Sequence, residues 1–515
     1  MPPAGAPQFD ELYVISDLHL GGSERFQIFN SGSELERLID NLRVTSPKKR
    51  VALVINGDFV DFLAEDDAKY FDPDGANDKL DRIIKRDAFK PVFEALARFT
   101  GAKNRRLVLT LGNHDLELSL PWVRTRLLEI LSGGKEEACG RITLAFDGAG
   151  FPCRVGDASV LCVHGNEVDV WNLADYERLR RFGVEVSHGR PIESWVPNAG
   201  TQLVIDIMNG VKRDYPFVDL LKPETEAAVP TLLALAPDQH VKLSSIGTTL
   251  WRRERDRVRH WTGFLGGSDE DDMPGRAAAL ADAFAPQRTN GIGLRPELFD
   301  RELYARMLLD DASENYHRGI DPMMLLGADE LGSRLGVFST ISGLATSAFK
   351  VTAAGIKLAV GMEPSEVLRQ ALDGLFKDKS FDPTTEDDTY KQLDKEVGDF
   401  DFLVSGHTHL ARALERKEKS GYYFNSGTWA RLIKLEENVL RSPEEFRKVY
   451  ETFGQKSMQA LDAHENLVMR RLSVVAIRED GGRTVGELRR VADHGPPGAV
   501  WRETEATLVM PKGGL

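Results

Sequence analysis

The chain has 515 residues, which is long enough for a large buried core and for more than one structural unit. It carries 66 basic and 80 acidic side chains, a net charge of −14, which argues against a broad surface for wrapping nucleic acid. Three cysteines give no disulfide framework, and neither a signal peptide nor an apolar stretch of membrane-spanning length is evident. We therefore expect a soluble cytoplasmic protein with no transmembrane segment. A small phosphorylated substrate is compatible with this acidic balance, because bound cations can reverse the field inside one cleft.

Several short apolar runs each lead into a polar cluster. In chain order these runs cover residues 12–16, 51–55, 107–111, 160–163 and 402–404. Continuous apolar runs of this length are typical of strands that are buried on both faces. Helical patterns over residues 33–42 and 86–99 lie between the first of these runs. Alternating strands and helices predict an α/β layered core in which the polar clusters gather at the carboxyl ends of the strands.

The spacing of the polar clusters changes after His164. The first four clusters fall within about 150 residues, but about 240 residues separate His164 from His407. A loop of that length does not belong inside a compact domain. We therefore predict a core formed by residues 9–170 and 398–515, with a C-terminal extension, and an insertion over residues 171–397. Helical patterns at 174–182, 202–211, 296–309 and 364–376 predict that the insertion is mostly α-helical.

After the last polar cluster the chain returns to strand patterns. Strands are predicted over residues 422–425, 431–435, 467–477 and 505–509, with one helix over residues 443–463. We expect these strands to complete the sheet system.

The polar clusters together offer carboxylate, amide and imidazole groups without any thiolate. The candidate metal ligands are Asp17, His19, Asp58, Asn113, His164, His407 and His409. Asp17 with His19, and His407 with His409, stand two residues apart, so in an extended chain each pair points to one side. This mixture of ligands suits Mn²⁺, Fe or Zn²⁺ better than Ca²⁺ or a cysteine-rich structural zinc site. Seven ligands are too many for one tetrahedral ion and suit two divalent ions that share a carboxylate.

Each cluster has a purely structural alternative when it is considered alone. An Asp-x-His pair can be a turn or a cap, His164 can be a hydrogen-bonded core histidine, and His407 with His409 can be a surface pair. The presence of five such clusters, each after a predicted strand, favours a metal site.

In chain order the clusters read D-x-H, G-D, G-N-H-D, H-G and G-H-T-H, and with them the chain closely resembles the calcineurin-like metallophosphoesterase superfamily. The resemblance covers residues 12–166 and 399–435 and leaves the insertion unmatched. It implies a two-sheet α/β sandwich with the site at its strand ends. It also implies a hydrolase that uses water activated by two metal ions to cleave a phosphomonoester, phosphodiester or pyrophosphate bond.

The resemblance assigns a role to each candidate residue. One ion would be held by Asp17, His19, Asp58 and His409, and the other by Asp58, Asn113, His164 and His407. His114 would be a catalytic residue that faces the substrate rather than a ligand. Asp61 or Asp115 could orient the His114 imidazole; the family favours Asp61, and Asp115 could instead cap a helix.

Departures from two branches of the superfamily narrow the substrate. Phosphoprotein phosphatases place arginines where this chain has Phe62 and Leu116, which disfavours that subclass. The opening motifs also resemble the UDP-2,3-diacylglucosamine pyrophosphohydrolase branch, whose short lid does not account for the long insertion. We therefore expect a phosphorylated small-molecule or lipid substrate, while nucleic acid is possible but not favoured.

The insertion leaves further alternatives open. Because it enters after His164 and leaves before His407, a cap over the cleft is the simplest role for it. Its basic residues 251–257 could meet phosphate, and its apolar residues 335–349 could face acyl chains, although ordinary helix faces explain both. Residues 425–429 resemble the closing turn of the family and could border the site. The alternative functions are a nuclease and a non-catalytic metal-binding interaction scaffold. The sequence specifies neither the native metals nor the oligomeric state.

Overall fold

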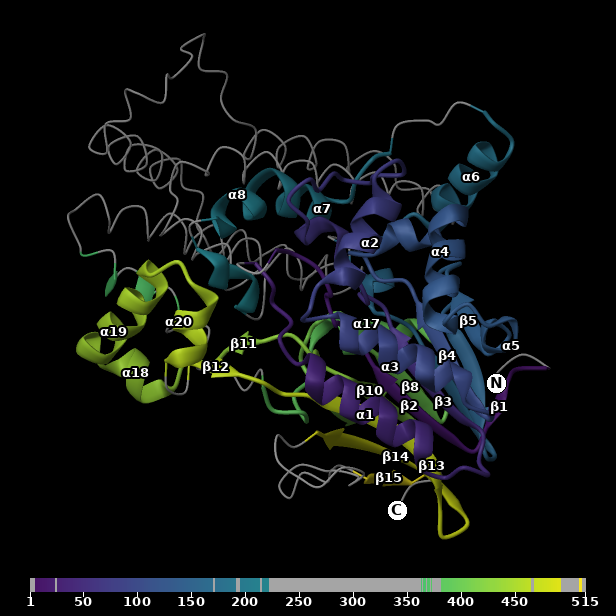
Figure 1. Ribbon diagram of the computed structural model, residues 1–515. Helices are drawn as coiled ribbons and strands as arrows, with labels where there is room; N and C mark the ends of the chain where they lie inside the picture. The colour runs from purple at the N-terminus through teal and green to yellow at the C-terminus, as the bar shows by residue number, and fades with distance from the viewer. Residues whose placement is uncertain are drawn as a thin grey trace, which may run out of the picture. The chain divides into compact units, whose positions relative to one another are not determined.

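The computed structural model describes residues 5–23, 26–169, 172–190, 195–213, 215–221, 381–464, 467–491 and 509–511, with a few positions between 363 and 372 (Figure 1). The chain divides into two compact units. The first consists of Met1–Pro223, Phe376–Glu436 and Glu451–Leu515, and the second of Glu224–Leu375 and Glu437–Tyr450. All candidate site residues lie in the first unit.

One sheet of the first unit has seven strands. Their order is β15 (Val509–Pro511), β14 (Arg483–Arg490), β13 (Ser473–Asp480), β2 (Glu11–Ile15), β3 (Val51–Asn56), β4 (Arg105–Thr110) and β5 (Ile142–Ala145). Strands β2 to β5 are parallel, whereas β13 pairs antiparallel with β2. The carboxyl ends of β2, β3 and β4 therefore meet at one edge, where the predicted polar clusters begin.

The second sheet has six strands. Their order is β1 (Gln8–Phe9), β6 (Phe151–Val155), β7 (Ala158–Cys162), β8 (Phe402–Ser405), β10 (Tyr422–Asn425) and β9 (Arg412–Glu415). Strands β7 and β8 are adjacent and parallel, with Leu161 opposite Leu403. After the long insertion, the chain thus re-enters the sheet at β8, next to β7, the last strand before the insertion. A separate pair joins β11 (Leu432–Ile433) and β12 (Val468–Met469).

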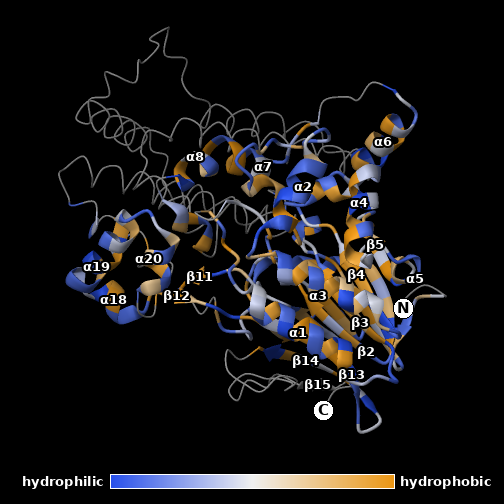
Figure 2. Ribbon diagram, in the orientation of Figure 1, coloured by the Kyte–Doolittle hydropathy of each residue, from blue (hydrophilic) through white to orange (hydrophobic). Residues whose placement is uncertain are grey.

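Strands β2, β3 and β8 are buried along their whole length, as their continuous apolar runs predict. In β2, Leu12 and Val14 pack in a cluster with Val160 and Phe402 of the second sheet. Tyr13 and the other alternate residues of β2 pack instead with the helices on the outer face. Figure 2 shows β2, β3 and β4 mostly in the hydrophobic colour. Burial of apolar surface on both faces is the main force that holds the layers together.

Helices cover the outer faces of the two sheets. On the first sheet these helices include α1 (Gly32–Val44), α2 (Ala76–Lys85), α3 (Lys90–Gly101) and α4 (Pro121–Ser132), and the short α5 (Glu136–Cys139) packs against α3 and α4. On the second, Tyr390 and Leu393 of α17 (Asp388–Glu396) pack against Leu403 and Tyr423. The predicted two-sheet α/β sandwich is confirmed.

Several predicted boundaries are wrong for local reasons. The helix predicted at 86–99 begins at Lys90, because Pro91 in its first turn favours a start there and residues 86–89 form a turn. The helix predicted at 443–463 is two helices, α19 (Pro443–Gly454) and α20 (Met458–Ala463), since Lys456 has a φ of 53° and Ser457 caps α20. The strand predicted at 467–477 is likewise divided between β12 and β13.

The part of the predicted insertion that the structure describes is helical. It comprises α6 (Tyr176–Ser187), then α7 (Ala199–Leu203), a π-helix (Val204–Met208) and α8 (Asn209–Lys212) in one run, and a 3₁₀ turn (Pro216–Leu220). The described positions between 365 and 372 are helical too, and α18 (Glu437–Arg441) follows the last sheet motif. Residues 251–257, 296–309 and 335–349 lie outside the described residues, so the domain boundaries and the cap remain predictions. Within the described ranges, no helix has both the length and the apolar character needed to cross a membrane.

Candidate metal centre

Five loops converge at the strand ends of the two sheets. They follow β2, β3 and β4 in one sheet and β7 and β8 in the other. Backbone bonds hold these loops together: the amides of Leu18 and His19 each donate to Asp58 O at 2.9 Å, and Gly406 N donates to His164 O at 2.8 Å. The ligand-bearing loops are therefore fixed to one another independently of their side chains.

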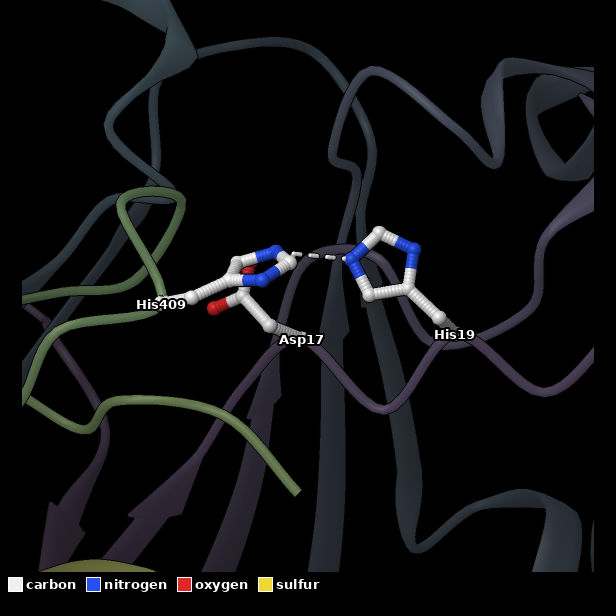
Figure 3. Close-up of side chains that lie close together, drawn as sticks. All are labelled: Asp17, His19 and His409. Carbon is white, nitrogen blue, oxygen red and sulfur yellow. Dashed lines mark hydrogen bonds and ion pairs between the residues drawn. The ribbon is translucent and has the colours of Figure 1, made fainter. Parts of the chain in front are cut away.

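Asp17, His19 and His409 form the first group of candidate ligands (Figure 3). His19 Nε2 lies 3.0 Å from His409 Nε2, which in turn lies 3.4 Å from Asp17 Oδ1. All three side chains are buried. The lone pairs of two imidazole nitrogens repel each other at this distance unless a proton or a cation lies between them. The group is therefore suited to a metal ion.

Asp58 links this group to a second one. Its Oδ2 lies 3.7 Å from His19 Nε2 and 3.2 Å from His164 Nε2, and Asp17, Asp58 and His164 form a second compact group. Burial would raise the pKa of Asp58, but the charges of His164, His114 and His19 outweigh it and hold that pKa well below its ordinary value. Asp58 is thus an ionised carboxylate between two sets of histidines.

His164 and Asn113 each present a buried polar atom that could bind a cation. His164 Nδ1 donates to Asn56 O at 2.8 Å, which leaves Nε2 as the ligand nitrogen. Burial lowers the pKa of His164, but Asp58 and Asp17 raise it to about 10, so a positive charge is favoured here. His164 Nε2 faces Asp58 Oδ2 at 3.2 Å, and Asn113 Oδ1 has no hydrogen-bond partner among the described residues. A buried polar atom in that state fits a metal ion.

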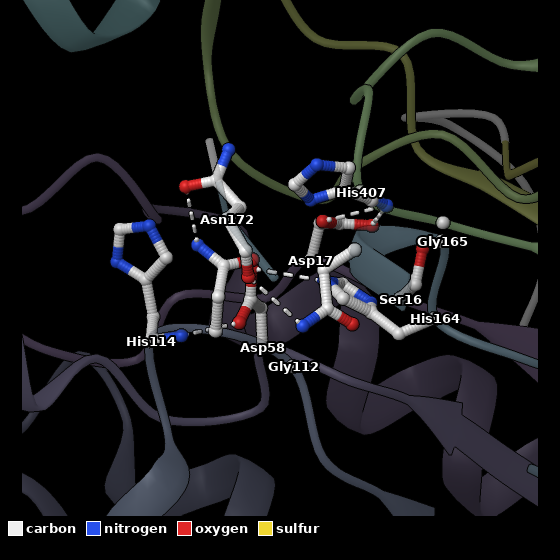
Figure 4. A network of polar contacts seen from close by, with 12 residues as sticks. Ser16, Asp17, Asp58, Gly112, His114, His164, Gly165, Asn172 and His407 are labelled. Atoms are coloured by element: carbon white, nitrogen blue, oxygen red, sulfur yellow. Dashed lines mark hydrogen bonds and ion pairs between the residues drawn. The ribbon is translucent and has the colours of Figure 1, made fainter. Parts of the chain in front are cut away.

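His407 stands beside these groups rather than within them. Its Nε2 lies 2.7 Å from Asp169 Oδ2, and its ring centroid is 5.3 Å from that of His164. Its backbone N–H also donates to the Asp17 carboxylate, at 3.0 and 3.1 Å from the two oxygens (Figure 4). With Nε2 paired, Nδ1 is the ring nitrogen that can bind a cation.

His114 and Asp61 lie next to the candidate ligands. Asp61 Oδ2 is 3.1 Å from His19 Nδ1 and 3.1 Å from His114 Nδ1. Burial would raise the pKa of Asp61, but the two histidines hold it well below its ordinary value. The His114 side chain is 18% exposed, against 3% for His19. His114 also belongs to a third close group with His19 and Asp58, so its greater exposure, rather than distance, sets it apart from the ligands.

The family comparison agrees with this geometry. The model of the calcineurin-like phosphoesterase family matches residues 11–220, which carry four of the five ligand loops. This stretch of the chain is similar to that family. No curated protein matches the sequence significantly. The fifth loop of the candidate metal centre, with His407 and His409, lies outside the matched span, and the parallel pairing of β7 and β8 brings it beside the other four.

Asp115 has a different role from both of those considered for it. Its Oδ2 accepts from Phe59 N at 2.8 Å and its Oδ1 from Gly112 N at 2.7 Å, so it connects two ligand loops of the candidate metal centre. Burial and the charge of Asp58 raise its pKa to about 8. It makes no side-chain cap bond to the 3₁₀ turn (Leu116–Ser119) that follows, so the prediction of a helix cap is wrong.

The backbone of the ligand loops is not extended, which corrects one step of the sequence argument. The ligands in left-handed backbone conformations are Asp17, His19, Asp58, His407 and His409, with φ between 48° and 72°. The Asp17–His19 and His407–His409 pairs are therefore aimed by left-handed turns beyond the strand ends and not by strand alternation. Such conformations are costly outside glycine and cluster at functional sites.

Residues 425–429 border the site, as their position after β10 predicts. Asn425 Nδ2 donates to Gly406 O at 2.6 Å, and Thr428 Oγ1 donates to Asp17 O at 2.7 Å. This turn therefore supports the loops that carry Asp17 and His407. Phe62 and Leu116, which replace the arginines of phosphoprotein phosphatases, are buried in the core.

Two polar residues near the candidate metal centre were not identified from the sequence. Asp169 contacts His407, and Asn172 Oδ1 accepts from Asn113 Nδ2 at 3.3 Å. Their proximity to His164 in the sequence was the available signal. Asn172 was missed because residue 171 was taken as the start of the insertion, and Asp169 was missed because it belongs to none of the five polar clusters.

Gly57 allows His164 to approach the loop after β3. Its φ is +83°, and a Cβ there would lie 2.2 Å from His164 Nδ1. We expect Gly57→Ala to destabilise the protein by at least about 2 kcal/mol and to reduce its metal content, because both the backbone and the ligand ring must move. Denaturant unfolding and elemental analysis would measure these effects. Gly183→Ala is the matched control, because Gly183 lies inside α6 with no atom within 4 Å of an added Cβ. That change is expected to be neutral or slightly stabilising, and equal effects of the two substitutions would refute the steric explanation.

Proposed function

We propose that the chain hydrolyses phosphoester bonds with the aid of two divalent metal ions bound at the strand ends. One ligand set consists of Asp17, His19, Asp58 and His409, and the other of Asp58, Asn113, His164 and His407. The observation that carries this proposal is the position of Asp58 Oδ2, 3.7 Å from His19 Nε2 and 3.2 Å from His164 Nε2. A single carboxylate between two sets of histidines is the arrangement that a shared bridging ligand requires.

The donor set indicates the class of metal. Carboxylate, amide and imidazole donors without thiolate favour manganese, iron or zinc. Two such ions would supply Lewis acidity at the phosphoryl group and would lower the pKa of a water molecule toward neutrality.

His114 is proposed as the catalytic residue that protonates the leaving oxygen. It is more exposed than the buried ligands, so a substrate can reach it. Asp61 pairs with its Nδ1, and the ionised carboxylate favours the protonated imidazolium. The Nε2–H can then donate to the departing alkoxide, as general acid catalysis requires. Asp61 Oδ2 also pairs with Nδ1 of His19, so one carboxylate contacts both the proposed acid, His114, and a proposed metal ligand, His19.

The proposed substrate is a phosphorylated small molecule or a lipid. Phe62 and Leu116 pack in the core at the positions where phosphoprotein phosphatases carry arginines. The net charge of −14 disfavours an extended nucleic-acid surface.

Removal of the metals tests the proposal directly. We expect chelator-treated protein to lose hydrolysis of bis-p-nitrophenyl phosphate and p-nitrophenyl phosphate, and Mn²⁺ to restore it as two ions bind per chain. Activity should fall by at least about 100-fold, because the proposed attack on phosphorus depends on the metal-activated water. A sample with two bound ions that turns over no phosphomonoester, phosphodiester or pyrophosphate would favour the interaction scaffold instead. A preference for DNA among active substrates would indicate the nuclease.

A further inference from the structure

Asp169 and Asn172 form a chain of polar contacts that ends at two proposed metal ligands. Asp169 Oδ2 lies 2.7 Å from His407 Nε2 and also accepts from Asn172 Nδ2 at 2.7 Å. Asn172 Oδ1 accepts from Asn113 Nδ2 at 3.3 Å (Figure 4). The contacts therefore run from His407 through Asp169 and Asn172 to Asn113.

The chemistry of Asp169 fixes the direction of every bond in this chain. An ionised carboxylate can only accept, so both His407 Nε2 and Asn172 Nδ2 must donate to it. Asn172 then has only its carbonyl oxygen directed at Asn113, so Asn113 must donate through its Nδ2. A flip of either amide would place two acceptors or two donors against each other.

The directions of these hydrogen bonds determine which atoms of His407 and Asn113 remain available to bind a cation. Because His407 Nε2 donates to Asp169, Nδ1 is the ring nitrogen left to bind a cation. Asn113 keeps Oδ1, which is buried and has no hydrogen-bond partner among the described residues. Both atoms belong to the ligand set that also contains His164.

The turn that carries Asp169 and Asn172 is itself held in place. Asp169 N donates to Asn166 O at 3.2 Å, and Asn172 N donates to Asp169 O at 3.1 Å. Asn166 Nδ2 donates to Asn172 O at 3.2 Å. These bonds give the two side chains a defined origin just after the His164 loop.

We propose that Asp169 and Asn172 are positioning residues that orient His407 Nδ1 and Asn113 Oδ1 toward one of the two metal ions. The inference rests on the proposed two-ion function. The other ligand set is oriented differently, because His19 pairs with Asp61. Loss of the polar contacts of Asp169 and Asn172 therefore weakens the binding of one metal ion and not of the other.

The test is a titration of metal-free, full-length protein with Mn²⁺, followed by calorimetry and by the electron paramagnetic resonance signal of coupled ions. In Asp169→Ala and in Asn172→Ala we expect one dissociation constant to rise about 10- to 100-fold and the other to stay within about twofold. Asp169→Asn should have an intermediate effect, because the amide oxygen can still accept from His407. Asp175→Asn is the matched control. Asp175 lies on the same segment but caps α6 through Arg178 N, so it should leave both constants unchanged.

The outcomes separate this proposal from the proposed function. Equal weakening of both ions, no weakening, or a lower melting temperature without a selective effect on one ion would overturn the positioning role. Wild-type protein that binds two ions but hydrolyses no phosphoester would refute the function while the selective effect could still be measured. Wild-type protein that binds only one ion would overturn both proposals.

Discussion

Replacement of Asp58 by alanine is expected to weaken the binding of both metal ions and to remove hydrolysis. The reason is geometric, because one carboxylate oxygen lies within 3.7 Å of His19 Nε2 and within 3.2 Å of His164 Nε2. We expect turnover to fall by roughly 10⁴-fold or more, since the metal ions supply most of the rate enhancement in this mechanism. Elemental analysis after dialysis and steady-state kinetics would measure the two effects.

Variants that lack a ligand to only one ion are the controls for Asp58→Ala. His409→Ala removes a ligand from the first group alone, and His164→Ala removes one from the second, so each should weaken a single ion. Asp58→Asn guards against simple misfolding, because its amide oxygen can still accept from His114 N, the bond that Asp58 Oδ1 makes at 2.9 Å. If Asp58→Asn weakened one ion only, Asp58 would be a terminal ligand and the proposed bridge would be wrong.

The sandwich and most of the site could be predicted because both depend on local patterns. The buried runs of β2, β3 and β4 are continuous and apolar, and each ends directly before a polar cluster. Parallel strands place those ends at one edge, so the convergence of Asp17, Asp58 and Asn113 follows from topology. The joining of β7 to β8 across the insertion has no local signal. The sequence did not predict this pairing; it predicted only that the insertion enters after His164 and leaves before His407.

The parts that were missed depend on contacts between distant residues. Nothing in the sequence around Asp169 shows that its carboxylate meets His407, which is 238 residues further along the chain. The left-handed backbone at His19 and His409 was not predicted either, because side-chain identity alone does not reveal φ. The role of Asp115 was missed because its partners, Phe59 N and Gly112 N, are backbone groups of two different loops.

The second large effect is expected at His114. We expect His114→Ala to keep both metal ions with unchanged affinity but to lose about 10²- to 10⁴-fold in turnover, the usual contribution of a general acid. The loss should be greatest for alkyl phosphates, whose leaving oxygen needs a proton, and smaller for p-nitrophenyl esters, whose leaving group departs as a stable anion. Kinetics on such a substrate pair, together with metal analysis, would show both features.

His188→Ala is the control for this variant, because His188 is exposed at the end of α6 and has no contact with a candidate ligand. The opposite outcome has a clear meaning, since His114 lies in a close group with His19 and Asp58. If His114→Ala released an ion, His114 would be a ligand and Asp61 would position two ligands instead of a ligand and an acid. If it kept both ions and slowed both kinds of ester equally, His114 would stabilise the phosphoryl charge, because proton donation to the leaving group predicts unequal losses. The leaving-group dependence therefore decides the chemical role, and the metal content decides whether His114 belongs to the metal centre.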